Sequence, residues 1–142
     1  MKFHADAVLR QYTTIGLEGL VSQASPHELV RMLMDGFLDR VSAARAQIAN
    51  NDIAGKGVSL GRALGIIEGL RTSLDADAGG ELAENLENLY DYIARRVVQA
   101  SATNEVAALE EVSALMTQIR ESWIAIGVDA MSQESTRAAN AG

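Results

Sequence analysis

The sequence offers few side chains suited to catalysis. It has no cysteine, so disulfides, cysteine nucleophiles and cysteine-based zinc sites are excluded. Its only histidines are His4, near the N-terminus, and His27, in the first turn of a predicted helix, where an exposed side chain is the ordinary expectation. The Glu-x-x-His pairs that hold two iron ions in helical bundles do not occur. These observations predict a protein that is not an enzyme.

Two short segments have residue types that bind ions, but their surroundings argue against it. Asp75 and Asp77 resemble the start of a calcium loop, yet the residues after them do not supply further oxygen ligands at the required positions. Gly79 and Gly80 precede a predicted helix and could offer backbone N–H groups to an anion, but the nearby Glu81 would repel a phosphate. We therefore expect no metal and no other cofactor.

Composition narrows the class of protein further. The 142 residues carry a net charge of −7, which argues against nucleic acid as a partner because that affinity depends on Lys and Arg. No apolar run is long enough to cross a bilayer and no secretory signal is recognisable, so we expect no membrane insertion and a cytoplasmic location. Only 4% of the residues are aromatic and the chain contains a single proline. This composition, in a chain of this length, favours a single helical domain.

The segment from Leu74 to Arg96 organises the predicted fold. Two adjacent glycines, Gly79 and Gly80, lose too much backbone entropy to sit comfortably within a helix, so the chain should reverse direction there. About five turns of amphipathic helix follow. Their apolar stripe, which must be buried against something, consists of Leu82, Leu86, Leu89, Ile93 and Val97, with Tyr90 and Tyr92 at its edges.

Capping signals place three more helices. Ser25 and Pro26, with Glu28 three residues after the serine, predict a helix over residues 26–49. Asp52 should cap a second helix, and Thr103 or Asn104 should cap the last, which should end at Gly127. The apolar stripe of the second helix is Leu60, Ala63, Leu64, Ile67, Leu70 and Leu74, and that of the last is Leu109, Val112, Met116, Ile119 and Trp123.

Short connections between four such helices predict an all-α, antiparallel up-down-up-down four-helix bundle over residues 25–127. The apolar arm formed by residues 1–24 should pack on it, and residues 128–142 should form a flexible tail. The second helix carries a glycine on each of four successive turns, at Gly57, Gly61, Gly65 and Gly69. Either packing offsets their cost, or they let another helix approach closely.

The predicted helices also contain more large apolar residues than a bundle core needs, including Ile66, Tyr90, Tyr92, Leu115 and Ile126. Three explanations remain open for this excess. The N-terminal arm covers it, an apolar groove accepts an amphipathic helix of another protein, or the chain is a structural or regulatory bundle that associates with itself, for example as a homodimer.

Several segments resemble the family of flagellin-specific export chaperones called FliS. They are SPHELVRMLMDGFL (25–38), ALGIIEGLRTSLD (63–75), GGELAENLENLYDYIARR (79–96) and RESWIAI (120–126), in the family's order. The resemblance implies a cytoplasmic chaperone that binds the C-terminal segment of flagellin, prevents premature polymerisation and assists type III export through the flagellar export apparatus. The residues expected to contact flagellin are Tyr12, Ile15, Leu60, Leu64, Ile67, Leu86, Leu89, Tyr90, Ile93 and Trp123.

Overall fold

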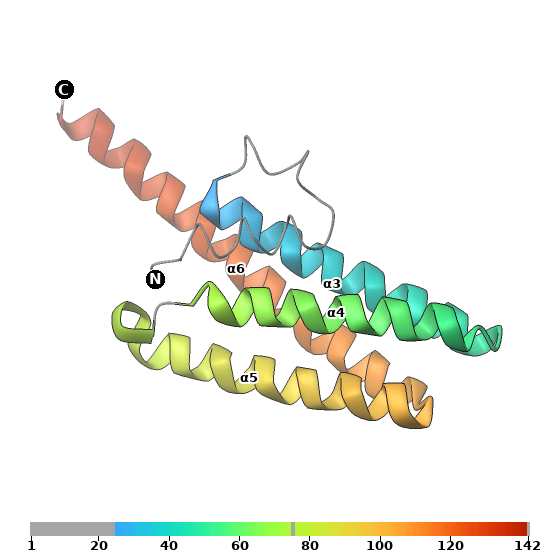
Figure 1. The fold of residues 1–142 in the computed structure, drawn as a ribbon. Coiled ribbons are helices and arrows are strands. Elements are labelled where there is room, and N and C mark those ends of the chain that lie inside the picture. The colour runs from blue at the N-terminus through green and yellow to red at the C-terminus, as the bar shows by residue number, and fades with distance from the viewer. Residues whose placement is uncertain (1–24, 75, 142) are drawn as a thin grey trace.

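The computed structural model describes the backbone of residues 25–74 and 76–141, and the side chains of residues 25–74 and 79–127. The described residues form four helices, shown in Figure 1: α3 (Pro26–Ala49), α4 (Ile53–Thr72), α5 (Ala76–Thr103) and α6 (Val106–Ala141). The predicted all-α four-helix bundle is confirmed. The N-terminal arm, with Tyr12 and Ile15, lies outside the described residues, so its packing stays a prediction.

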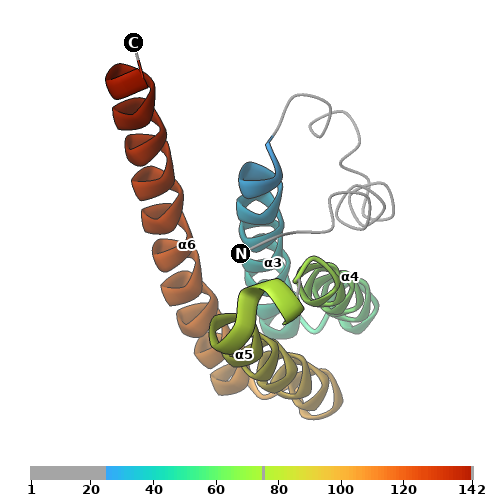
Figure 2. The same cartoon turned by 90° about the vertical axis from the view of Figure 1, so that its left-hand side faces the viewer.

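Each helix packs against two others, in a closed ring. Successive helices run in opposite directions, and α3 contacts both α4 and α6 while α5 contacts the same two helices (Figures 1 and 2). This is the antiparallel arrangement that short connections impose. Over the residues described, none of the helices is apolar enough along eighteen residues to span a lipid bilayer.

The first two helices begin where the sequence predicts. The Ser25 hydroxyl accepts a hydrogen bond from the backbone N–H of Glu28 at 3.2 Å, and Asp52 accepts one from that of Gly55 at 2.9 Å. Both side chains therefore satisfy N–H groups that have no partner within their own helix. Asn51, with φ 58°, turns the chain between these helices.

The start of α5 differs in detail from the prediction. The chain bends at Gly80, which has φ 57° and ψ −132°, a conformation that only glycine adopts readily. One helical turn precedes the bend, so α5 begins at Ala76 rather than after the glycine pair. Gly80 is therefore a non-helical break between two helical segments, and the longer segment follows the glycine pair as predicted.

Both predicted ends of the last helix are wrong. Thr103 is the final residue of α5, and Asn104, with φ 57°, donates its backbone N–H to the carbonyl of Ala100 and so terminates α5. The last helix, α6, begins at Val106 and continues past Gly127 to Ala141, beyond the ends of its neighbours (Figures 1 and 2). Residues 128–141 contain no proline and are rich in alanine, so nothing in the chain stops the helix at a single glycine.

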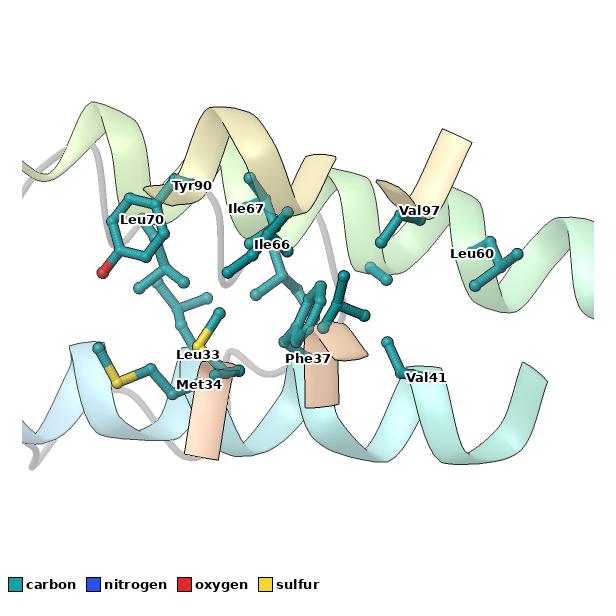
Figure 3. Close-up of a cluster of buried hydrophobic side chains, with 14 of the residues drawn as sticks. Leu33, Met34, Phe37, Val41, Leu60, Ile66, Ile67, Leu70, Tyr90 and Val97 are labelled. Atoms are coloured by element: carbon teal, nitrogen blue, oxygen red, sulfur yellow. The ribbon is translucent and has the colours of Figure 1, made fainter. Parts of the chain in front are cut away.

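The core lies between all four helices. Figure 3 shows Leu33, Phe37 and Val41 of α3 facing Leu60, Ile66 and Ile67 of α4, with Tyr90 and Val97 of α5 above them. On α6, the buried residues are Ala108, Leu109, Val112, Met116 and Trp123. Ile66, which the sequence suggested as surplus, is 2% exposed and belongs to this core.

The row of glycines on α4 faces open space for most of its length. A methyl group added at Gly57, Gly61 or Gly65 would meet no side chain and no other helix of the described residues within 4 Å, whereas Gly69 is buried. Among the described residues, no helix uses the first three glycines for a close approach. Packing of the four helices therefore does not require glycine at these three positions.

Candidate functional site: an apolar groove between α5 and α6

An apolar groove runs along the surface between α5 and α6. Three neutral polar residues, Asn85, Gln118 and Ser122, stand among its apolar ones, and the groove has a volume of about 270 Å³. Its apolar lining consists of Leu82, Leu86, Leu89, Ile119, Trp123 and Ile126. We call this surface the α5–α6 groove. Because none of the described residues that line it is charged, it suits apolar groups rather than ions or polar substrates.

The two walls of the groove have the same spacing. On α5 the apolar residues stand at 82, 86 and 89, and on α6 at 119, 123 and 126, so each wall follows the i, i+4, i+7 pattern of one helix face. Seven residues of helix span about 10 Å. The groove is therefore about two helical turns long, and an amphipathic helix with the same spacing would match it.

Much of this apolar surface is open to solvent. Leu82 is 46% exposed, Leu89 36% and Ile126 45%. Large apolar side chains exposed singly are common, but three that line one groove form a continuous patch, the kind of surface that marks interaction sites.

The structure separates the predicted contact residues into distinct groups. Leu86, Leu89 and Trp123 line the α5–α6 groove. Leu64 is partly buried and packs against the core. Four more of the described residues are in the core, at most 2% exposed, and offer no surface to a partner in this conformation: Leu60, Ile67, Tyr90 and Ile93.

Three groove residues were absent from the predicted contact set. The sequence pattern places Leu82 and Ile119 in stripes expected to be buried, and Ile126 among the extra apolar residues at the edge of its helix. The signal that identifies them is the matched spacing of the two walls. It becomes interpretable only once α5 and α6 are known to lie side by side.

Trp123 connects the groove to the start of α3. Its indole N–H donates to the carbonyl oxygen of His27 at 2.9 Å, and its own carbonyl lies 2.8 Å from Nε2 of His27. Because a carbonyl can only accept, Nε2 is the protonated ring nitrogen. The two rings are stacked, with centroids 4.4 Å apart and planes 7° apart. The expectation that His27 is merely an exposed residue of the first turn is therefore wrong.

A cluster of polar side chains joins α5 to α6 beyond Leu89. The Tyr92 hydroxyl donates to Glu111 at 2.6 Å, and Nε of Arg96 donates to the same carboxylate oxygen at 2.8 Å. These two hydrogen bonds hold the pKa of Glu111 below its usual value, and the Tyr92 bond raises the pKa of that phenol. Tyr92 and Arg96 follow Leu89 by three and seven residues, which places them on the same face of α5. The apolar groove therefore ends at a charged bridge.

In the part of the chain that the structure describes, no three His, Asp or Glu side chains are grouped so that they could hold a metal ion. What the groove presents is apolar surface with a few neutral hydrogen-bonding groups. It is suited to recognising a partner.

Comparisons with known proteins identify the family to which the chain belongs. Residues 8–130 match the family described as flagellar protein FliS. A protein of Pseudomonas aeruginosa, flagellar secretion chaperone FliSB, is 42% identical over 84% of this chain and 95% of its own. Flagellar secretion chaperone FliS of Salmonella typhimurium is 41% identical over 89% of this chain and 95% of its own. The protein of the same name from Escherichia coli is 48% identical over 79% and 83%. The chain therefore belongs to the FliS family of flagellar proteins.

Proposed function

We propose that this protein is a flagellar secretion chaperone that uses the α5–α6 groove to bind the C-terminal segment of flagellin. Relatives from three bacteria, each matched over most of its length, carry the name flagellar secretion chaperone. The observation that carries the groove assignment is the pair of apolar walls with one helical spacing, of which Leu82, Leu89 and Ile126 are exposed. A surface of this kind binds an amphipathic helix.

The groove alone is too short to hold a long segment tightly. At about 10 Å it contacts two helical turns, whereas a segment that folds on binding typically buries on the order of 1,000 to 3,000 Å² and loses about 2 to 5 kcal/mol to ordering. We infer that the groove anchors one amphipathic stretch while the rest of the segment lies over other faces of the bundle.

Binding of this kind prevents polymerisation by competition. The apolar face of flagellin that enters the groove becomes unavailable for contacts between flagellin subunits. The chaperone would act in the cytoplasm, before export, and would release flagellin at the flagellar export apparatus. This sequence of events requires that the chaperone binds the flagellin monomer tightly and that the complex dissociates at the export apparatus.

Self-association is the competing function for the same surface. The exposed side chains of Leu82, Leu89 and Ile126 would also be buried if two copies placed their grooves together as a homodimer. Light scattering over a concentration series, with and without a flagellin C-terminal peptide, separates the two. An oligomer that the peptide leaves intact favours self-association, whereas a monomer that forms a one-to-one complex favours the chaperone.

The direct test uses the full chain and its flagellin. Isothermal titration calorimetry should show saturable binding of a C-terminal flagellin peptide and no binding of a peptide with the same composition in scrambled order. A stoichiometric amount of the chain should also delay flagellin polymerisation in a turbidity assay. If neither effect is observed with folded protein, the proposal fails.

A further inference from the structure

The contact between His27 and Trp123 has no role in the function proposed so far. His27 does not line the α5–α6 groove, but it holds Trp123, which does. The two residues are 96 positions apart in the chain, so their contact ties the first turn of α3 to the groove wall on α6.

We propose that His27 is a positioning residue, which holds the indole of Trp123 in the orientation that shapes the α5–α6 groove. The inference rests on the proposed function, since it concerns how the same groove is kept ready for its occupant. The Trp123 indole stacks on the His27 ring and donates its N–H to the backbone carbonyl of His27, and these two contacts restrict the torsions of the indole. The His27 ring is itself fixed by the hydrogen bond from its Nε2 to the backbone carbonyl of Trp123. A Trp held in this way does not have to lose rotamer freedom when a partner binds.

Gly127 provides the space that this contact needs. It stands one turn after Trp123 on α6, and a methyl group built on it would overlap the imidazole ring of His27. Gly127 therefore does not mark the end of a helix. It leaves space for the imidazole ring of His27 on α3. A substitution there would displace His27 without altering any groove residue.

This arrangement gives two independent ways to break the contact. His27→Ala removes the ring and its N–H, and Gly127→Ala pushes the ring out. A matched control is Gly61→Ala, the same change at a helical glycine whose added methyl group meets no other side chain or helix. In the double variant the new methyl group at residue 127 occupies space that the missing ring has vacated.

The experiment measures binding of the flagellin C-terminal peptide and the accessibility of Trp123. The chain has one Trp, so acrylamide quenching of its fluorescence reports on this residue alone. We expect His27→Ala and Gly127→Ala each to weaken binding about tenfold, the combined effect of one hydrogen bond and one aromatic stack. Both should also increase quenching in the free protein, while Gly61→Ala should change neither quantity.

The double variant separates positioning from general damage. If Gly127→Ala acts through His27, then adding it to His27→Ala should weaken binding by less than twofold further. Two separate tenfold losses that multiply would overturn the proposal, as would wild-type affinity and quenching in folded His27→Ala. If the wild-type chain does not bind the peptide, the proposed function fails, and quenching alone then decides whether His27 positions Trp123.

Discussion

The ammonium group of Lys56 on α4 donates a hydrogen bond of 2.9 Å to the carbonyl oxygen of Ser101 in the last turns of α5. It also donates to Oδ1 of Asn104, the residue that turns the chain from α5 into α6. Lys56 is only 7% exposed. A single buried side chain thus links the start of α4 to the connection between the two helices that form the groove.

Removing this link should destabilise the bundle. We expect Lys56→Ala to lower the free energy of unfolding by about 2 kcal/mol, because it deletes two hydrogen bonds from a charged donor. Urea denaturation followed by circular dichroism measures the change. Arg62→Ala, at an exposed position on the same helix, is the control and should stay within about 0.5 kcal/mol of the wild type. A loss for Lys56→Ala no larger than the control would show that the buried contact contributes nothing.

Replacing two glycines of α4 with alanine should stabilise the protein. Gly61 and Gly65 lie inside the helix with open space around them, so an added methyl group causes no clash. Alanine is better than glycine in a helix interior by up to about 1 kcal/mol. The double variant should therefore unfold at a higher temperature in differential scanning calorimetry. A lower melting temperature would indicate that something packs closely against this face.

The charged bridge at the end of the groove should make stability depend on pH. The pKa of Glu111 is lowered in the folded chain, chiefly by the hydrogen bond from Tyr92 and then by that from Arg96. A carboxyl with a depressed folded pKa binds fewer protons folded than unfolded, so its contribution is present above the unfolded pKa and is lost as pH falls. Glu111→Gln should thus be less stable than the wild type at pH 7, and the difference should shrink at pH 3. Urea titrations at both values test this, and a constant difference would contradict it.

The starts of α3 and α4 were predictable because their causes are local. Ser25 and Asp52 cap their helices through N–H groups three residues away, and that spacing is visible in the sequence. The roles of Gly127 and His27 were not predictable, because they depend on contacts between distant parts of the chain. His27 lies next to Gly127 and Trp123 only when α3 and α6 pack together.

The helical periodicity of the sequence identified the apolar side of α5, but it could not show which residues on that side are buried and which are exposed. Leu89 and Ile93 are one turn apart in the same predicted stripe, yet Leu89 is 36% exposed and Ile93 is fully buried. Tyr90, placed at the edge of that stripe, is 2% exposed, whereas Leu82, its reference residue, is 46% exposed. The buried side of α5 is rotated from the predicted one because α4 and α6 together decide which residues are covered.

The α5–α6 groove is tested most directly by placing a negative charge on each of its walls. Leu89 and Ile126 are suitable because both are exposed, whereas a charge at Ile93 would test only the core. Val58→Asp/Val98→Asp is the matched control, since both of its sites are exposed apolar residues outside the groove.

The decisive measurement is the affinity of the folded Leu89→Asp/Ile126→Asp variant for the flagellin C-terminal peptide by titration calorimetry. We predict a loss of about a hundredfold, because two carboxylates would be buried against apolar side chains without partners. The control variant should bind as the wild type does. If the groove variant keeps native helical content and binds with wild-type affinity, flagellin does not occupy this groove.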